Sequence, residues 1–147
     1  MTWEELGPVF EGLAFAPRPL RAATAQVTSK YDLGPRGAFI LSLISGGKKY
    51  PLELSEMLKA GRSLITAELA RLTEAGLVTA TPGQHDRRRS ELALTPLGQQ
   101  ECRHVREEMA RIVRQNLAAY SVEDLELFAR MLRDVRQRGD DDAAGGC

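Results

Sequence analysis

Apolar residues recur every three or four positions along most of the chain, and this spacing predicts amphipathic helices. The first helix is expected to begin at Thr2 and Glu5, which have the spacing of a capping box. Its apolar stripe consists of Trp3, Leu6, Phe10 and Leu13. A second helix is predicted over residues 20–31, and a third runs from residue 35 to the turn SGGKK at residues 45–49. The positions expected to face the core from the third helix are Phe39, Ile40, Leu43 and Ile44.

A short helix, a break and a longer helix follow this turn. Pro51 suits the first position of the short helix, because that position needs no backbone N–H. The inward-facing residues of the short helix are expected to be Leu54, Met57 and Leu58. The longer helix is predicted over residues 62–75, and Gly76 supplies the residue expected just past a helix end.

The spacing changes to an apolar-alternating pattern at residues 77–81 and 91–95, which predicts two antiparallel strands joined by a loop. Thr95 and Pro96 then form a cap and first turn for a long helix that extends to about residue 119. Ser121 and Asp124 form another capping box, and the last helix is expected to end near Arg138. The final GDDDAAGGC has no apolar content to bury, so residues 138–147 are predicted to form a disordered tail.

This order of elements defines the expected fold class. A short helix, a turn, a helix and then a two-stranded hairpin make a winged helix-turn-helix, in which the hairpin is the wing. The sequence therefore predicts a mostly α-helical protein with a small β-hairpin wing and a helical dimerisation layer. Residues 1–137 are expected to form a single winged domain, with a DNA-binding lobe at about 35–95 and dimerisation helices at about 3–31 and 96–137.

Composition narrows the function classes further. The 147 residues carry 20 basic and 20 acidic side chains, so any nucleic-acid binding must depend on a local patch. Cys102 and Cys147 show neither metal-ligand spacing nor a disulfide framework, which favours the reducing cytoplasm and no metal or cofactor. The first 25 residues lack the long apolar run of a signal peptide or membrane span.

The predicted helix at residues 62–75 is the candidate recognition helix, because the second helix of a helix-turn-helix enters the DNA major groove. On a helical wheel Ile65, Leu69 and Leu72 fall on one side, which we expect to be buried. The opposite side is small and uncharged, so it can lie flush in a groove, and consists of Ser63, Thr66, Ala67 and Ala70. Ser63 and Thr66 can bond base edges, and Arg62 and Arg71 can reach phosphates. The alternative is a small-residue face packed on another helix.

The predicted wing loop carries three consecutive arginines, Arg87, Arg88 and Arg89. A basic wing beside a recognition helix can contact phosphates or the minor groove, where negative potential attracts arginine. The alternative for the wing alone is a solvated charged turn. Because the small-faced helix is followed directly by the arginine-tipped hairpin, as in a winged helix-turn-helix, DNA binding is favoured over these alternatives.

Two rival functions are weaker. His85 and His104 have no nucleophile and orienting acid at recognisable spacing, and no Gly-rich phosphate loop is present, so an enzyme is not expected. A winged domain used for protein–protein contact would not need the arginine-rich tip.

The residues DRRRSELALTPLG resemble the wing signature of the MarR family of transcription regulators. The matching positions are Asp86, Arg88, Leu94, Thr95 and Gly98. The segment LSEMLKAGRSLITAELARLTEAGLV resembles the family's helix-turn-helix, and the resemblance covers roughly residues 20–135. The chain departs from the family at Ala67, where arginine is frequent, and at Gly61, where a polar helix cap is usual. It also lacks the N-terminal cysteine of the family's peroxide sensors.

The resemblance implies a homodimer that binds double-stranded DNA at a pseudo-palindromic operator, acting as a repressor that a small phenolic or aromatic acid releases. It further implies an effector pocket between the helical layer and the winged lobe. Residues expected to bind an aromatic carboxylate there are Arg18, Arg21, Phe39, Leu43, Tyr50 and His104.

Three apolar stripes independently predict dimerisation, because a winged domain already has its own core. One stripe is Trp3, Leu6 and Phe10. The other two, on the last two helices, are Val105, Met109, Ile112 and Val113, and Leu125, Phe128, Leu132 and Val135.

Overall fold

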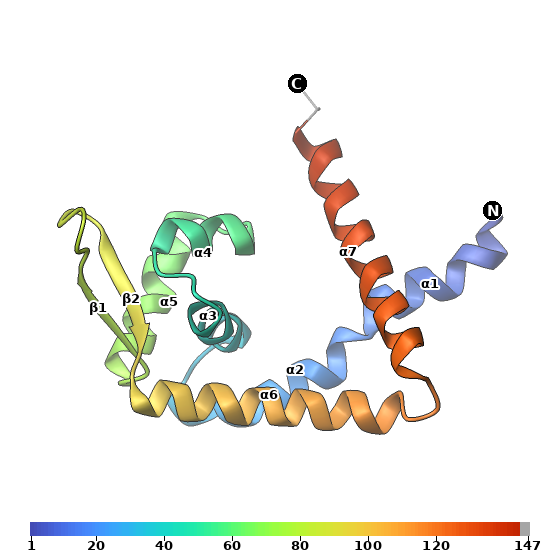
Figure 1. Ribbon diagram of the computed structural model, residues 1–147, viewed down its shortest axis with the longest axis horizontal. Helices are drawn as coiled ribbons and strands as arrows, with labels where there is room; N and C mark the ends of the chain where they lie inside the picture. The colour runs from blue at the N-terminus through green and yellow to red at the C-terminus, as the bar shows by residue number, and fades with distance from the viewer. Residues whose placement is uncertain (145–147) are drawn as a thin grey trace. The chain divides into compact units, whose positions relative to one another are not determined.

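The computed structural model describes the backbone of residues 1–144 and the side chains of residues 1–34 and 36–136. Residues 1–112 form one compact unit, and the described residues from 113 onward belong to a second. Figure 1 shows the elements, which are α1 (Trp3–Phe15), α2 (Pro17–Thr28), the 3₁₀ helix η1 (Ser29–Tyr31), α3 (Pro35–Ser45), α4 (Pro51–Leu58), α5 (Arg62–Glu74), β1 (Val78–Pro82), β2 (Ser90–Leu94), α6 (Pro96–Asn116) and α7 (Val122–Ala144). Within these residues no helix combines the length and the apolar run that crossing a membrane would require.

The ends of the helices follow from local hydrogen bonds and backbone geometry. Thr2 and Glu5 form the expected capping box at the start of α1, where the Glu5 carboxylate accepts from the Thr2 N–H at 2.6 Å. The carboxylate of Glu53 likewise accepts from the N–H groups of Lys49 and Tyr50, at 2.8 and 3.0 Å, where α4 begins. Gly76 adopts a φ of 72° just past α5, a conformation that glycine tolerates without strain.

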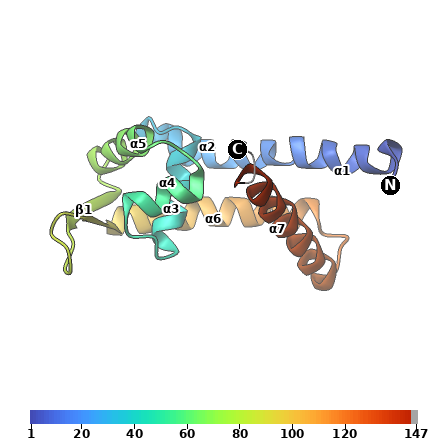
Figure 2. The same cartoon turned by 90° about the horizontal axis from the view of Figure 1, so that it is seen from above.

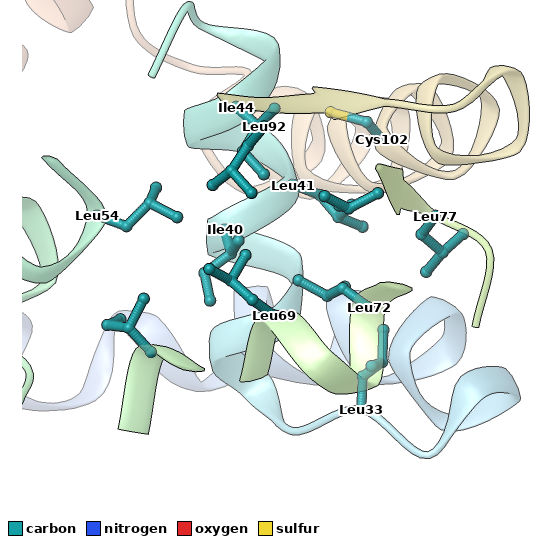
Figure 3. Packing of buried hydrophobic residues seen from close by; sticks show 12 residues of the cluster. Leu33, Ile40, Leu41, Ile44, Leu54, Leu69, Leu72, Leu77, Leu92 and Cys102 are labelled. Carbon is teal, nitrogen blue, oxygen red and sulfur yellow. The ribbon is translucent and has the colours of Figure 1, made fainter. Parts of the chain in front are cut away.

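The main core lies where α3, α4, α5 and the hairpin meet. Figure 3 shows this cluster, in which Ile40, Leu41, Leu54 and Leu72 are fully buried. The expectation that Phe39 and Met57 face the core is wrong, because their exposed fractions are 45% and 47%. Residues 38–41 and 43–44 of α3 are all apolar, so their spacing alone could not show which side faces inward, and Leu41 occupies the position expected for Phe39.

A smaller cluster joins α2, α3 and α6. Val27, Ala38 and Val105 are buried together, with Met109 packed against them. The expectation that Val105 belongs to a dimerisation stripe is therefore wrong, since only 1% of its surface is exposed within its own chain. This cluster packs the long helix α6 against α2 and α3, which precede α5.

The hairpin is short and regular. Val78 pairs with Leu94 and Thr81 with Glu91 in an antiparallel register. The Leu92 N–H also donates to the Lys49 carbonyl at 2.7 Å, so the chain before α4 lies along the edge of β2.

A close junction connects α5, the hairpin and α6. The Thr95 hydroxyl donates to the Gly76 carbonyl at 2.6 Å and accepts from the Gly98 N–H at 3.0 Å. The Thr95 N–H donates to the Leu77 carbonyl at 3.1 Å. Gly98 itself lies against Leu77, and a Cβ there would overlap the Leu77 carbonyl oxygen. Only glycine fits at this position, which is the physical reason for Gly98.

The last helix is longer than the sequence pattern indicates. It was expected to end near Arg138, with a disordered tail beginning there, but the backbone of α7 is helical to Ala144. Ala143 and Ala144 have high helix propensity, but Gly139 and the three aspartates that follow it do not, so propensity does not explain why the helix continues here. The end of the predicted tail, residues 145–147 with Cys147, lies outside the described residues.

The junction generates a stability prediction. Gly98→Ala should lower the free energy of unfolding by about 1–3 kcal/mol or more, because the rigid Leu77 backbone must move to make room. Gly12→Ala in α1 is the matched control, because a Cβ there meets nothing within 4 Å. Denaturant unfolding at one protein concentration measures both changes. A Gly98→Ala variant as stable as the control would show that the junction tolerates a side chain.

Candidate nucleic-acid interface

Helix α5 presents the face expected of a recognition helix. Ile65, Leu69 and Leu72 are buried, as their spacing predicted. The predicted DNA-binding residues of this helix are all exposed, and these are Arg62, Ser63, Thr66, Ala67, Ala70 and Arg71. The small-residue face is therefore not packed on another helix within the described chain.

Thr66 has its hydroxyl proton already engaged. Its Oγ1 donates to the Arg62 carbonyl at 2.9 Å, one turn earlier in the helix. The oxygen keeps its lone pairs as acceptors and the methyl group remains available. This geometry suits Thr66 to accept from a base amino group or to contact a thymine methyl, while donation to a base would require the internal bond to break.

Sequence reasoning missed Glu68, which the spacing of charged residues gave no reason to single out. Glu68 is 6% exposed although it belongs to α5, the candidate recognition helix. Its Oε1 lies 3.9 Å from Arg71 Nη1, and its Oε2 has no hydrogen-bond partner among the described residues. The carboxylate thus draws Arg71 toward the helix and reduces the positive charge that Arg71 offers to a phosphate.

The wing tip is shaped by backbone bonds around Asp86. The Gly83 N–H donates to the Arg89 carbonyl at 2.7 Å, and the Arg89 N–H donates to the Asp86 carbonyl at 3.0 Å. The Asp86 Oδ1 accepts from the Arg88 N–H at 3.0 Å. A Cβ at Gly83 would lie 2.8 Å from the Asp86 carbonyl oxygen, so the turn also requires glycine. In both views the tip extends away from the helices of its unit (Figures 1 and 2).

The three wing arginines are not equivalent. Arg89 Nε lies 3.8 Å from Asp86 Oδ2, so its charge is partly neutralised. Arg87 and Arg88 are exposed and have no ion-pair partner among the side chains that the structure describes. They are the wing cations available to an external anion.

The residues predicted to bind an effector lie on three helices of the first unit and at the residue before α4. Arg18 and Arg21 are on α2, and the Arg18 guanidinium lies 4.2 Å from the centre of the Phe15 ring. Phe39 and Leu43 are on α3, and Tyr50 directly precedes α4. His104 is on α6 and lines a hollow of about 200 Å³ that has none of the other five predicted residues in its lining.

His104 also belongs to a polar cluster around the buried Glu101, which sequence reasoning missed. The Tyr31 hydroxyl donates to Glu101 Oε1 at 2.7 Å, and His104 Nδ1 lies 3.4 Å from Oε2. Lys30 Nζ is 3.7 Å from the same Oε2. Burial raises the pKa of the Glu101 carboxyl, but the bonds from Tyr31 and His104 and the charge of Lys30 outweigh it, so the pKa lies below its ordinary value. The bond to Glu101 is the main cause that raises the pKa of Tyr31.

A helix-turn-helix with an exposed small-residue face, an arginine-tipped hairpin and long flanking helices is the winged helix-turn-helix fold of MarR-family regulators. Solved structures with this fold match nearly the whole chain. The transcriptional regulator BldR from Sulfolobus solfataricus is 23% identical with a TM-score of 0.73, over 94% of this chain and 99% of BldR. A MarR family protein from Bacillus stearothermophilus is 22% identical with a TM-score of 0.73, over 95% and 99% of the two chains.

A third similar structure contains a bound molecule. It is the PcaV transcriptional regulator from Streptomyces coelicolor in complex with its natural ligand, 22% identical with a TM-score of 0.60, over 82% of this chain and 88% of PcaV. No protein-family model and no curated protein sequence matches the chain. At these identities the likeness establishes the fold, and it confirms the predicted fold class.

The Glu101 cluster generates a pH prediction. Glu101→Gln should lower the free energy of unfolding at neutral pH by about 1.5–3 kcal/mol, the range for a hydrogen bond to a charged group. The folded-state pKa of Glu101 lies below the ordinary 4.5, so its contribution is complete above that value and is lost as the pH falls through the folded-state pKa. Denaturant unfolding at several pH values should therefore show the gap between wild type and variant closing on acidification. A difference in stability between wild type and variant that does not change with pH would contradict the lowered pKa of Glu101.

Proposed function

We propose that this protein is a sequence-specific DNA-binding transcription regulator that acts as a homodimer. The observation that carries the proposal is the pairing, in one unit, of the exposed small-residue face of α5 with the unpaired Arg87 and Arg88. The transcriptional regulators that share the fold support it. A winged domain that binds only proteins would have no need for two unpaired arginines at the wing tip.

The DNA-binding roles follow from chemistry and exposure. We assign base contacts to Ser63 and Thr66, with Ala67 and Ala70 allowing the helix to approach closely. Arg62 at the start of α5 contacts a phosphate, whereas Arg71 contributes less because Glu68 lies beside it. Arg87 and Arg88 contact phosphates or the minor groove, and Arg89 holds the turn through Asp86.

The proposed dimer rests on apolar surface that the described chain leaves uncovered. In α1, Trp3 and Phe10 are 69% and 62% exposed. In the second unit, a hollow of about 320 Å³ is lined almost entirely by apolar side chains, including Tyr120, Phe128 and Met131. Large exposed apolar patches mark interaction sites, and a second copy of the chain is the partner that the operator symmetry of such regulators requires.

We further propose that a small aromatic acid controls DNA binding, with repression as the expected mode. Such a ligand can release DNA only if it binds the DNA-free arrangement of the wings more tightly than the DNA-bound one. The six predicted effector residues remain a prediction, and PcaV with its natural ligand supports the idea that this fold accommodates an effector.

A salt series tests the wing assignment. Arg88→Ala should weaken operator binding at least about tenfold, and its log–log salt slope should flatten by about one to two units for the two wings of a dimer. Arg89→Ala is the matched control and should cost less, because Arg89 is already paired with Asp86. If Arg88→Ala bound like wild type at every salt concentration, the wing would not contact DNA.

Ser63→Ala or Thr66→Ala should instead reduce discrimination between sequences.

The oligomeric state is a separate prediction. Light scattering should give a dimer at micromolar concentration, held by an apolar interface of about 2,000 Å² or more. Phe128→Glu should dissociate it, because the exposed ring lies in the apolar hollow of the second unit. A wild-type monomer under these conditions would rule out the proposed dimer.

A further inference from the structure

We infer that a groove formed by α3, β2 and α6 binds a small anion with an apolar body. The groove has a volume of about 470 Å³ and lies wholly within the first unit. It shares no residue with the six effector residues predicted from sequence. The inference deepens the ligand-responsive part of the proposed function and depends on it only for the regulatory role of the ligand.

The floor of the groove is apolar. Ile44, Leu92 and Cys102 line it and are 7%, 4% and 2% exposed, so they form a firm surface continuous with the main core. Figure 3 shows these three side chains coming from α3, β2 and α6. Such a floor favours a ring or a short hydrocarbon chain by removing it from water.

The rim of the groove is basic. Its charged lining residues are Lys49, Arg103 and Arg106, and no carboxylate belongs to the lining. Lys49 is partly satisfied by Glu91, whose Oε1 lies 3.4 Å from Lys49 Nζ. Arg103 and Arg106 lie three residues apart on α6, so they project from the same side of the helix. Among the side chains that the structure describes, neither arginine has an ion-pair partner.

Two unpaired guanidinium groups above an apolar floor define the ligand chemistry. Guanidinium groups form paired hydrogen bonds to a carboxylate, and these charge-assisted bonds are stronger than neutral ones. Ser45 and Gln99 add neutral polar groups to the lining. A small aromatic or short acyl carboxylate fits this groove, because its carboxylate can pair with the arginines of the rim while its apolar body packs on the floor.

The hollow between α2 and α6 is a poorer site for such an anion. It is lined by Lys30 and His104 but also by the carboxylates of Glu107 and Glu108, and its volume is about 200 Å³. The acidic lining repels a carboxylate ligand, which the groove at β2 does not.

The position of the groove gives its occupant direct contact with the wing. Leu92, Ala93 and Leu94 of β2 line it, and β2 leads directly to the arginine-bearing tip. A ligand that shifts β2 would alter how Arg88 meets DNA, and DNA would by linkage change the affinity of the ligand equally.

The test is a titration of the full-length protein with benzoate, benzamide and acetate. Calorimetry measures the affinity, and amide chemical shifts locate the binding site. Benzoate should bind, benzamide and acetate should bind at least about tenfold more weakly, and the shifts should centre on Gly47, Leu92 and Leu94. The double variant Arg103→Gln/Arg106→Gln should lose at least about tenfold in benzoate affinity. Arg114→Gln, an exposed arginine of α6 outside the groove, should retain it.

Several outcomes would overturn the inference. These are equal binding of benzamide and benzoate, an unchanged affinity in the double variant, shifts centred on Gln26 and Lys30, or no benzoate binding up to about 10 mM. Operator titrations of the same proteins without ligand test the proposed function separately. Wild-type protein that binds the operator but shows no benzoate binding would thus refute the groove alone.

Discussion

The hydroxyl of Thr95 is the contact on which the arrangement of the winged unit depends. It donates to the carbonyl at the end of α5 and accepts from the first turn of α6, while the Thr95 backbone pairs with Leu77 at the start of the hairpin. Helix α5, the hairpin and α6 are thereby fixed to one another within a few residues. The close approach at Gly98 makes this possible, because a side chain there would push α6 away from Leu77.

Ion pairs within the chain then determine which basic side chains remain available to bind an external anion. Arg71 lies beside the buried Glu68, Arg89 beside Asp86, and Lys30 beside Glu101. Among the described side chains, the arginines without an ion-pair partner include Arg87 and Arg88 at the wing tip and Arg103 and Arg106 at the rim of the groove at β2. A chain with no net charge can therefore present local positive surfaces, which its composition alone conceals.

The order of the elements could be predicted from the sequence because the spacing changes cleanly from helical to alternating and back. The burial of Ile65, Leu69 and Leu72 was predictable for the same reason. Phe39 was assigned to the wrong side because nearly every neighbour in α3 is apolar. Val105 was assigned to a dimer stripe because periodicity identifies an apolar face without identifying its partner.

Contacts between distant residues could not be predicted in this way. The bond between Tyr31 and Glu101 joins residues 70 positions apart, and no local pattern marks either of them. The groove at β2 likewise depends on Lys49, Leu92 and Arg106 coming together from three separate segments. Local sequence patterns predict the helices and the hairpin. Long-range hydrogen bonds and surface grooves depend on the tertiary fold and are not marked in the sequence.

The most direct test of the account is a competition titration with DNA from the neighbourhood of the protein's own gene. Two chains are expected to bind one pseudo-palindromic site, with half-sites about 10 bp apart. Binding should be at least about 10³-fold tighter than to random DNA at physiological salt. Equal affinity for every fragment from that neighbourhood and for random DNA would contradict the central claim that this fold reads a DNA sequence.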